Sequence, residues 1–258
     1  MSITRILKIF GIDPKKMIAG WFVLPGFLFQ YLRFKRTPTS ISKKIPFGKL
    51  RPELYDRFKS GGTAKGHYFH QDLYVAQKIF QNNPAKHVDI GSRVDGFVAH
   101  VASFREIEVF DIRETTSVAK NIVFKQADIT NLKQTHSNYA DSVSCLHALE
   151  HIGLGRYGDE LDQEGHVKGL ESLHSMLKEN GILYLSSPIG PLRVEFNSQR
   201  VFSIRYLLSL FEHQFNVEEF AYVDDSGDLV TDAKLLPDNI ESNFNCLYGC
   251  GIWTLKKI

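Results

Sequence analysis

The feature that most constrains the fold is a short apolar stretch that runs directly into a glycine turn, KHVDIGSRVDG at residues 86–96. Residues 87–90 are typical of a buried strand, and Gly91 at its end allows a tight turn and a close backbone approach to a ligand. The pattern G-x-G-x-x-G is absent, although a pyrophosphate would need such glycine amides at a helix N-terminus. The acidic Asp89 favours instead a ligand that carries a cationic amine.

Beyond this turn, strand-like apolar runs alternate with segments whose apolar residues recur at helical spacing. We expect strands at 107–110, 122–124, 141–146 and 182–186, helices at 72–81, 97–104, 165–177 and 203–211, and a closing antiparallel pair at 215–223 and 246–255. The residues Lys178–Gly181 predict a glycine C-cap for the helix at 165–177. This alternation indicates an α/β domain with a mostly parallel sheet.

Acidic residues stand just past the ends of the first three strands. Asp111 comes 20 residues after Gly91, where a carboxylate can accept both hydroxyls of a ribose, and Asp128 is placed to accept an adenine amino group. Each of the two could instead be a helix cap or a turn residue. Because open α/β sheets bind ligands at the carboxyl ends of their strands, the set favours S-adenosylmethionine over NAD.

Several separated blocks resemble a known family. The order V-D-I-G, F-D, Q-A-D and S-C-L-H-A-L-E-H-I resembles the class I S-adenosylmethionine-dependent methyltransferases. The segments HYFHQD (67–72), GLGRYGD (153–159) and EFNSQRVF (195–202) resemble one branch, a domain of unknown function found in nematodes and in bacterial surface-polysaccharide gene clusters. The resemblance covers roughly residues 60–258.

This resemblance implies a Rossmann-like three-layer sandwich with a seven-strand, mostly parallel sheet whose last strand is antiparallel. It implies S-adenosyl-L-methionine as cofactor, and we predict contacts to it from Tyr68, Asp89, Gly91, Ser92, Asp111, Ile112, Asp128, Ile129 and Leu146. The sequence departs from the family after Gly91, where a second glycine is common and Arg93 or Val94 stands instead.

Candidates for the chemistry follow the fourth strand. Methyl transfer is an in-line displacement, and an alcohol acceptor also needs a base to remove its proton. We predict His147 as the base and His151 as the second choice, with Glu150 beside them; either histidine could instead cap or pack against the following loop.

Substrate contacts are predicted in two later loops. Arg156 and Tyr157 lie in a glycine-rich loop that could form an acceptor wall, while Asn197 and Arg200 could clamp a sugar or phosphate. The alternative is that these residues only build their loops.

The N-terminal part differs in charge from the rest of the chain. Residues 1–51 carry eleven Lys and Arg and one acid, a net +10, so the remainder carries −8 of the total +2. The apolar segment Met17–Leu32 contains Pro25 and is short for a membrane span. We predict a helical arm over 1–50, linker included, followed by the methyltransferase-like domain over 51–258. Residues 1–36 of this arm would contact a membrane surface, pack on the body or a second subunit, or span the bilayer.

The three cysteines are Cys145, Cys246 and Cys250, and no secretory signal accompanies them. Their number and spacing indicate buried free thiols in a reducing compartment rather than disulfides or a zinc finger. A site built from His67, His70 and a downstream histidine is disfavoured, so no metal is predicted.

Together these observations predict a methyltransferase that methylates a sugar hydroxyl of a surface glycan or glycolipid, in the cytoplasm and in contact with the membrane. Two alternatives stay open: a catalytically inactive scaffold in polysaccharide assembly, and a nucleic-acid methyltransferase. Because no Asn/Asp-Pro-Pro-Tyr motif follows the fourth strand, no nucleic-acid partner is expected. A homo-oligomer is compatible with the sequence.

Overall fold

The computed structural model describes residues 7, 10–38, 45–116 and 118–258. The chain divides into two compact units, residues 1–63 and residues 64–258. Four basic residues of the predicted arm, and much of its linker, lie outside the described residues: Arg5, Lys8, Lys43 and Lys44.

The N-terminal unit is built around helix α2 (Pro14–Arg36), with a short 3-10 turn η1 (Asp56–Phe58) after it. The carboxylate of Asp13 caps the helix by accepting from the backbone N–H groups of Lys15 and Lys16 at 3.1 and 3.2 Å. The helix has 23 residues and continues through Pro25. By length and composition it could cross a membrane, with a mean hydropathy of 1.2 over its most apolar 18 residues.

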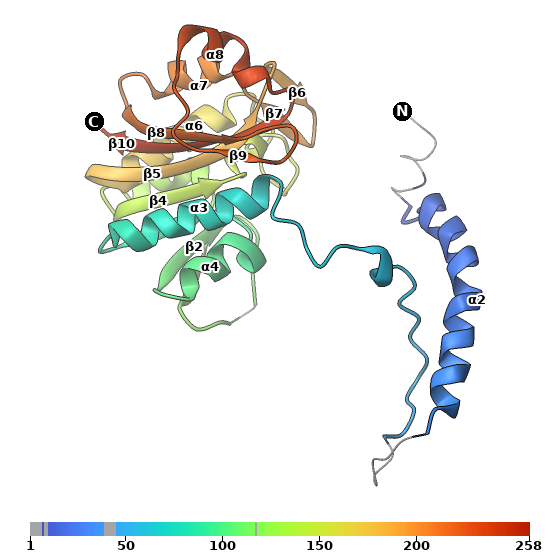
Figure 1. Ribbon diagram of the computed structural model, residues 1–258. Helices are drawn as coiled ribbons and strands as arrows, with labels where there is room; N and C mark the ends of the chain where they lie inside the picture. Colours follow the sequence, from blue (N-terminus) through green and yellow to red (C-terminus); the bar gives the residue numbers. More distant parts are fainter. Residues whose placement is uncertain (1–6, 8–9, 39–44, 117) are drawn as a thin grey trace. The chain divides into compact units, whose positions relative to one another are not determined.

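The second unit contains an eight-stranded sheet of order β3-β2-β1-β4-β5-β10-β8-β9 (Figure 1). The strands are β1 His87–Ile90, β2 Ile107–Asp111, β3 Ile122–Gln126, β4 Ala140–Leu146, β5 Leu177–Ile189, β8 Phe215–Val223, β9 Leu229–Val230 and β10 Gly249–Lys257. The first five are parallel, and β10 is antiparallel to both β5 and β8. The predicted mostly parallel sheet with its antiparallel last strand is confirmed, with the short edge strand β9 added.

Helices pack on both faces of this sheet, as the predicted three-layer sandwich requires. Helix α3 (His67–Asn82), the π turn η2 (Val94–Val98) and α4 (Ala99–Ala102) share one apolar core with β2, β8 and β10. The opposite core holds α6 (Gly165–Met176) and α7 (Ile204–Phe211). The shorter helices are η3 Ile129–Asn131, α5 Leu132–Thr135, η4 Leu149–His151, α8 Pro237–Glu241 and η5 Asn243–Asn245.

Three predicted helix boundaries were wrong. Helix α3 begins at His67 rather than 72, after Gly66, which gives no side-chain cap. The segment 97–104 forms the π turn and a four-residue helix, because Gly96 has non-helical backbone angles. Residues Lys178–Gly181 do not cap α6; the helix ends at Met176, and buried Leu177 already pairs with Ala140 in the sheet.

A small hairpin, β6 (Arg193–Glu195) and β7 (Gln199–Val201), follows β5. Asn197 adopts a left-handed conformation in its turn, with a φ of 61°. The hairpin places Ser198 and Gln199 beside the carboxyl ends of the parallel strands.

Candidate active site

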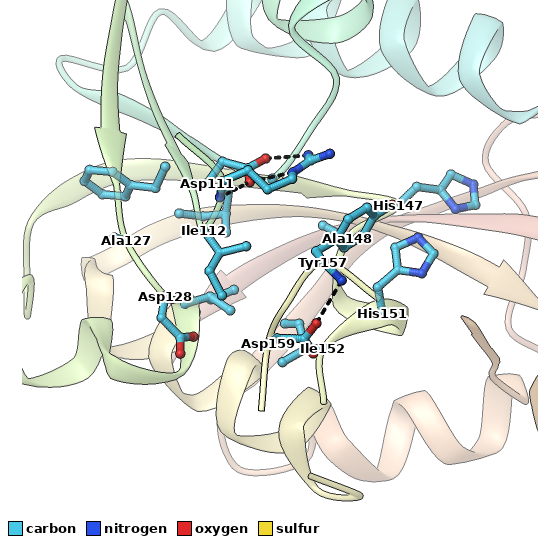
Figure 2. Close-up of a pocket in the computed structure, with 15 residues that line it drawn as sticks. Asp111, Ile112, Ala127, Asp128, His147, Ala148, His151, Ile152, Tyr157 and Asp159 are labelled. Atoms are coloured by element: carbon cyan, nitrogen blue, oxygen red, sulfur yellow. Dashed lines mark hydrogen bonds and ion pairs between the residues drawn. The ribbon is translucent and has the colours of Figure 1, made fainter. Parts of the chain in front are cut away.

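Two adjoining cavities lie at the carboxyl ends of β1, β2, β3 and β4. The small cavity, about 90 Å³, is lined by Gly91, Asp111, Ile112, Asp128, Ile129 and neighbouring residues. The large cavity, about 790 Å³, is lined by residues such as His67, Tyr68, Arg93, Arg156 and Tyr248. His147, His151 and Tyr157 line both, so the cavities form one cleft. Figure 2 shows Asp111 and Asp128 on one side of it and the two histidines on the other.

The carboxylate of Asp89 stabilises the turn after β1 through hydrogen bonds. This carboxylate is fully buried and accepts from the Ser92 N–H at 3.0 Å, the Ser92 hydroxyl at 2.7 Å and the Ser144 hydroxyl at 2.6 Å. Burial raises the pKa of Asp89 to about 6. Asp89 and Ser92 therefore shape the turn but do not line either cavity, whereas Gly91 does.

Gly91 needs its glycine for two reasons. Its φ of +69° is left-handed, and an added Cβ would lie 3.1 Å from the Cβ of Ala148. The backbone of Gly91 therefore packs closely against Ala148 and lines both cavities.

At the small cavity, Asp111 forms an ion pair with the side chain of Arg113. Arg113 donates to its carboxylate through Nε at 3.0 Å and Nη2 at 2.7 Å, and the Arg113 guanidinium also lies 4.5 Å over the Tyr157 ring. Arg113 thus bridges the two sides of the cleft above the small cavity. A ligand that used Asp111 would have to displace Arg113, whose side chain is 54% exposed.

Asp128 lines the small cavity and also caps η3. Its carboxylate accepts from the backbone N–H and the hydroxyl of Thr130 at 2.9 and 2.8 Å. The apolar side chains of Ile112 and Ile129 lie beside it in the cavity wall. Asp128 therefore caps a helix, as the alternative interpretation held, and also lines the cavity.

His147 is held rigidly between β4 and η4. Its left-handed backbone (φ 51°) places its N–H 3.1 Å from the Ser186 carbonyl, and its Nδ1 lies 2.6 Å from Oε1 of the buried Glu150. Burial lowers the pKa of His147, but the Cys250 sulfur and Glu150 oppose burial and raise it well above its usual range.

His151 has the opposite electrostatics. Its Nδ1 lies 2.7 Å from the Ser198 carbonyl, which can only accept, so Nδ1 carries the proton and Nε2 keeps its lone pair. Burial lowers the pKa of His151 below its usual range. His151 is therefore neutral near pH 7, with its free lone pair at the cleft.

The glycine-rich loop places Arg156 and Tyr157 at the large cavity, and both were predicted to contact the acceptor. The Asp159 carboxylate folds this loop by accepting from the N–H groups of Gly153, Gly155 and Tyr157 at 2.7, 3.2 and 3.1 Å. Arg156 donates to the Ser198 carbonyl at 3.0 Å, which joins the loop to the β6–β7 hairpin.

The other two predicted substrate residues do not line the cleft. Asn197 is exposed in the hairpin turn. Arg200 is buried and donates to four backbone carbonyls: Glu150 at 3.4 Å, Ile152 at 2.6 Å, Asp162 at 3.2 Å and Gln163 at 3.2 Å. These contacts make Arg200 part of the loop's framework, which was the alternative interpretation.

Tyr68 and Leu146, both predicted cofactor contacts, line the large cavity. The Tyr68 ring lies 5.1 Å from the His147 ring, and Arg93 lies 5.5 Å from the centre of the Tyr68 ring. The sequence interpretation missed Arg113, Gln199 and Tyr248. Only Arg113 had a local signal, because it stands two residues after a carboxylate at a strand end.

Comparisons place the chain among known proteins. The model of the family described as Caenorhabditis protein of unknown function, DUF268, matches residues 100–233, more than half of the chain. No curated protein matches the sequence.

Solved structures share the fold at low identity. A putative sarcosine dimethylglycine methyltransferase from Galdieria sulphuraria aligns with a TM-score of 0.51 at 14% identity, over 72% of this chain and 85% of that one. The 1,6-didemethyltoxoflavin-N1-methyltransferase of Burkholderia thailandensis aligns with a TM-score of 0.50 at 14% identity, over 72% and 78%. The [4+2]-cyclase SpnF aligns with a TM-score of 0.51 at 14% identity, over 73% and 80%.

The methyltransferase-like fold and the resemblance to the nematode branch are thus confirmed. The chain belongs to the family described as Caenorhabditis protein of unknown function, DUF268, and has the fold of the S-adenosylmethionine-dependent methyltransferases.

Proposed function

We propose that the protein is an S-adenosylmethionine-dependent methyltransferase that O-methylates a sugar hydroxyl of a glycan or glycolipid. The observation that carries the proposal is the cleft at the carboxyl ends of β1 to β4, with Asp111 and Asp128 on one side and His151 on the other. Open α/β sheets bind their ligands at this edge. The solved Burkholderia thailandensis enzyme with the same fold contains S-adenosylhomocysteine.

The residues of the small cavity fit the adenosine end of this cofactor. The Asp111 carboxylate suits the two ribose hydroxyls, Ile112 and Ile129 offer apolar faces to a purine, and Asp128 suits its amino group. The Gly91 backbone, with no side chain to hold a ligand away, borders the methionyl side. When bound, S-adenosylmethionine supplies an electrophilic methyl group.

His151 is the better general base of the two histidines, which reverses the order expected from the sequence. The acceptor hydroxyl must lose its proton as it attacks, and His151 offers an unprotonated Nε2 at the cleft. His147 directs its Nδ1 to the Glu150 carboxylate, and its Nε2 is buried, so it is less accessible to an acceptor hydroxyl.

The large cavity supports a sugar acceptor. It combines hydrogen-bonding groups, Arg156 and Gln199, with the aromatic rings of Tyr68, Tyr157 and Tyr248. Aromatic rings with polar tips can contact the apolar face of a sugar ring while the polar groups bind its hydroxyls.

Helix α2 supports an acceptor at a membrane. Its aromatic side chains are exposed, Trp21 by 74% and Phe22 by 82%, and basic residues stand at both of its ends. Such a helix suits a bilayer interface with anionic lipids.

Calorimetry with S-adenosylmethionine, S-adenosylhomocysteine and NAD tests the cofactor. We expect micromolar binding of both adenosyl ligands and none of NAD, with the binding of the adenosyl ligands weakened in Asp111→Ala. Binding of NAD alone would overturn the proposal, and no binding of any ligand would favour an inactive scaffold. Because a cyclase shares the fold, methyl transfer from labelled cofactor to oligosaccharide or glycolipid acceptors must be measured as well.

Vesicle flotation tests the membrane contact. The intact chain should float with vesicles containing anionic lipids, and a chain lacking residues 1–36 should not. Equal and negligible binding by both would remove the membrane from the proposal.

A further inference from the structure

Three potential metal ligands that the proposed reaction does not use meet at the floor of the large cavity. One ligand atom each from His67, His147 and Cys250 lies within 4.8 Å of the others. They come from three separate elements, the start of α3, the end of β4 and the strand β10. Cys250 is completely buried, and His147 nearly so.

The His147 ring is oriented as metal-bound histidines are. Its Nδ1 pairs with the carboxylate of Glu150 at 2.6 Å, and Glu150 itself is fully buried. Its Nε2 is buried and has no hydrogen-bond partner among the described residues. A carboxylate on one ring nitrogen fixes the tautomer and leaves the other nitrogen free to bind a metal.

His67 is the second imidazole. Its ring stacks on that of His147, with centroids 5.2 Å apart and planes 4° from parallel.

The charges of the cluster also call for a cation. A bound Cys250 thiolate and the Glu150 carboxylate would place two negative charges in a buried region, and a divalent ion would balance them. Two imidazoles and one thiolate are a ligand set suited to zinc.

We propose that His67, His147 and Cys250 bind one zinc-type divalent ion, with an open coordination position facing the large cavity. Three protein ligands and one open position are the arrangement of catalytic zinc sites. A tetrahedral site needs ligand atoms about 3.5 Å apart, so the three side chains need to move by about 1 Å. His67 and His147 both line the large cavity, which gives the ion an entry path.

The ion's role rests on the proposed function. At the open position it would bind the acceptor oxygen and lower the pKa of that hydroxyl, so that His151 removes its proton more easily. Metal binding itself is tested independently of this reaction.

The experiment uses the full chain without a histidine tag, stripped with a chelator and titrated with Zn²⁺ against a chromophoric chelator, and separately with Co²⁺. We expect one ion per chain and a thiolate-to-cobalt charge-transfer band. In Cys250→Ser the band should vanish, and in both Cys250→Ser and His67→Ala the affinity for Zn²⁺ should fall by about 100-fold or more. Glu150→Gln should weaken binding by about 10–100-fold, because it loses the carboxylate behind His147.

Cys246→Ser and His70→Ala are matched controls, since each changes the same residue type nearby but outside the cluster. Both should bind Zn²⁺ as the unchanged chain does. Absence of one-to-one binding, or wild-type affinity in Cys250→Ser, would overturn the proposal.

Calorimetry with S-adenosylhomocysteine on the same preparations separates the two proposals and shows that each variant is folded. Cofactor binding without metal binding would refute only the metal site. Metal binding without cofactor binding would refute the proposed function and leave the site.

Discussion

The small and large cavities are built in different ways. In the small cavity two carboxylates are paired with the residue two positions later in the sequence, Asp111 with Arg113 and Asp128 with Thr130. In the large cavity the contacts join distant segments, such as His67 with Tyr248 and His151 with Ser198. If the proposed function is correct, the cofactor contacts are encoded locally, whereas the acceptor contacts depend on how the whole sheet assembles.

The largest expected effect tests the acceptor side. His151→Gln should lower kcat by about 10²–10⁴-fold, because a positioned base contributes that much. Binding of S-adenosylhomocysteine should stay within about twofold, measured by calorimetry. Because burial lowers the pKa of His151, the unchanged enzyme's rate should rise with pH at a midpoint below about 6.5 and then stay level. An unchanged kcat in His151→Gln would return the role of base to His147.

The second prediction tests the small cavity. Asp111→Ala should weaken cofactor binding by about 10–100-fold, since it removes a charged hydrogen-bond acceptor for the ribose. Calorimetry gives this ratio, and kcat at saturating cofactor should change much less. If Asp111→Ala bound the cofactor normally but had a low kcat, the assignment of the cofactor to the small cavity and the acceptor to the large cavity would be contradicted.

The sequence predicted the locally encoded half well. The places of the parallel strands along the chain and the strand-end positions of Gly91, Asp111 and Asp128 follow from apolar runs and turn residues. It could not show that Arg113 closes over Asp111, because a side-chain rotamer has no sequence pattern. Cys250 was interpreted only as a buried thiol, because its proximity to His67 exists only once β10 pairs with β5.

A third, smaller effect concerns the strand that carries the first glycine turn. His87 in β1 is buried between the hydroxyls of Ser142 and Ser144, and burial lowers its pKa to about 3. An unfolded histidine, with a pKa near 6.5, binds a proton that the folded one does not, so stability is lost as the pH falls below about 6.5. At pH 5 this costs about 2 kcal/mol.

Denaturant titrations of the unchanged chain and His87→Gln at pH 7 and pH 5 measure this effect. The variant should lose about 2 kcal/mol less on acidification. Asp89, whose pKa is raised to about 6, acts in the opposite direction in both chains, so the difference between them isolates His87. Equal losses would show that the pKa of His87 does not differ between the folded and the unfolded chain.

The smallest effect concerns Arg113. Arg113→Gln should tighten cofactor binding by about fivefold or less, because an exposed ion pair is worth about 0–1 kcal/mol and here competes with the ribose. Weaker binding in this variant would instead make Arg113 a ligand to the cofactor. Calorimetry of the unchanged chain at low and high salt distinguishes the two, because salt should tighten binding if the ion pair competes and weaken it if Arg113 contacts the cofactor.

The four carbonyls held by Arg200 have a consequence for how this family can diversify. They lie at the two ends of the loop that carries Arg156 and Tyr157, so one guanidinium fastens both ends. A segment anchored in this way can change its length and residues between the anchors without disturbing the sheet. We expect exchange of residues 153–162 between relatives that keep Tyr157 and Asp159, both at the small cavity, to transfer acceptor preference while the cofactor affinity stays the same.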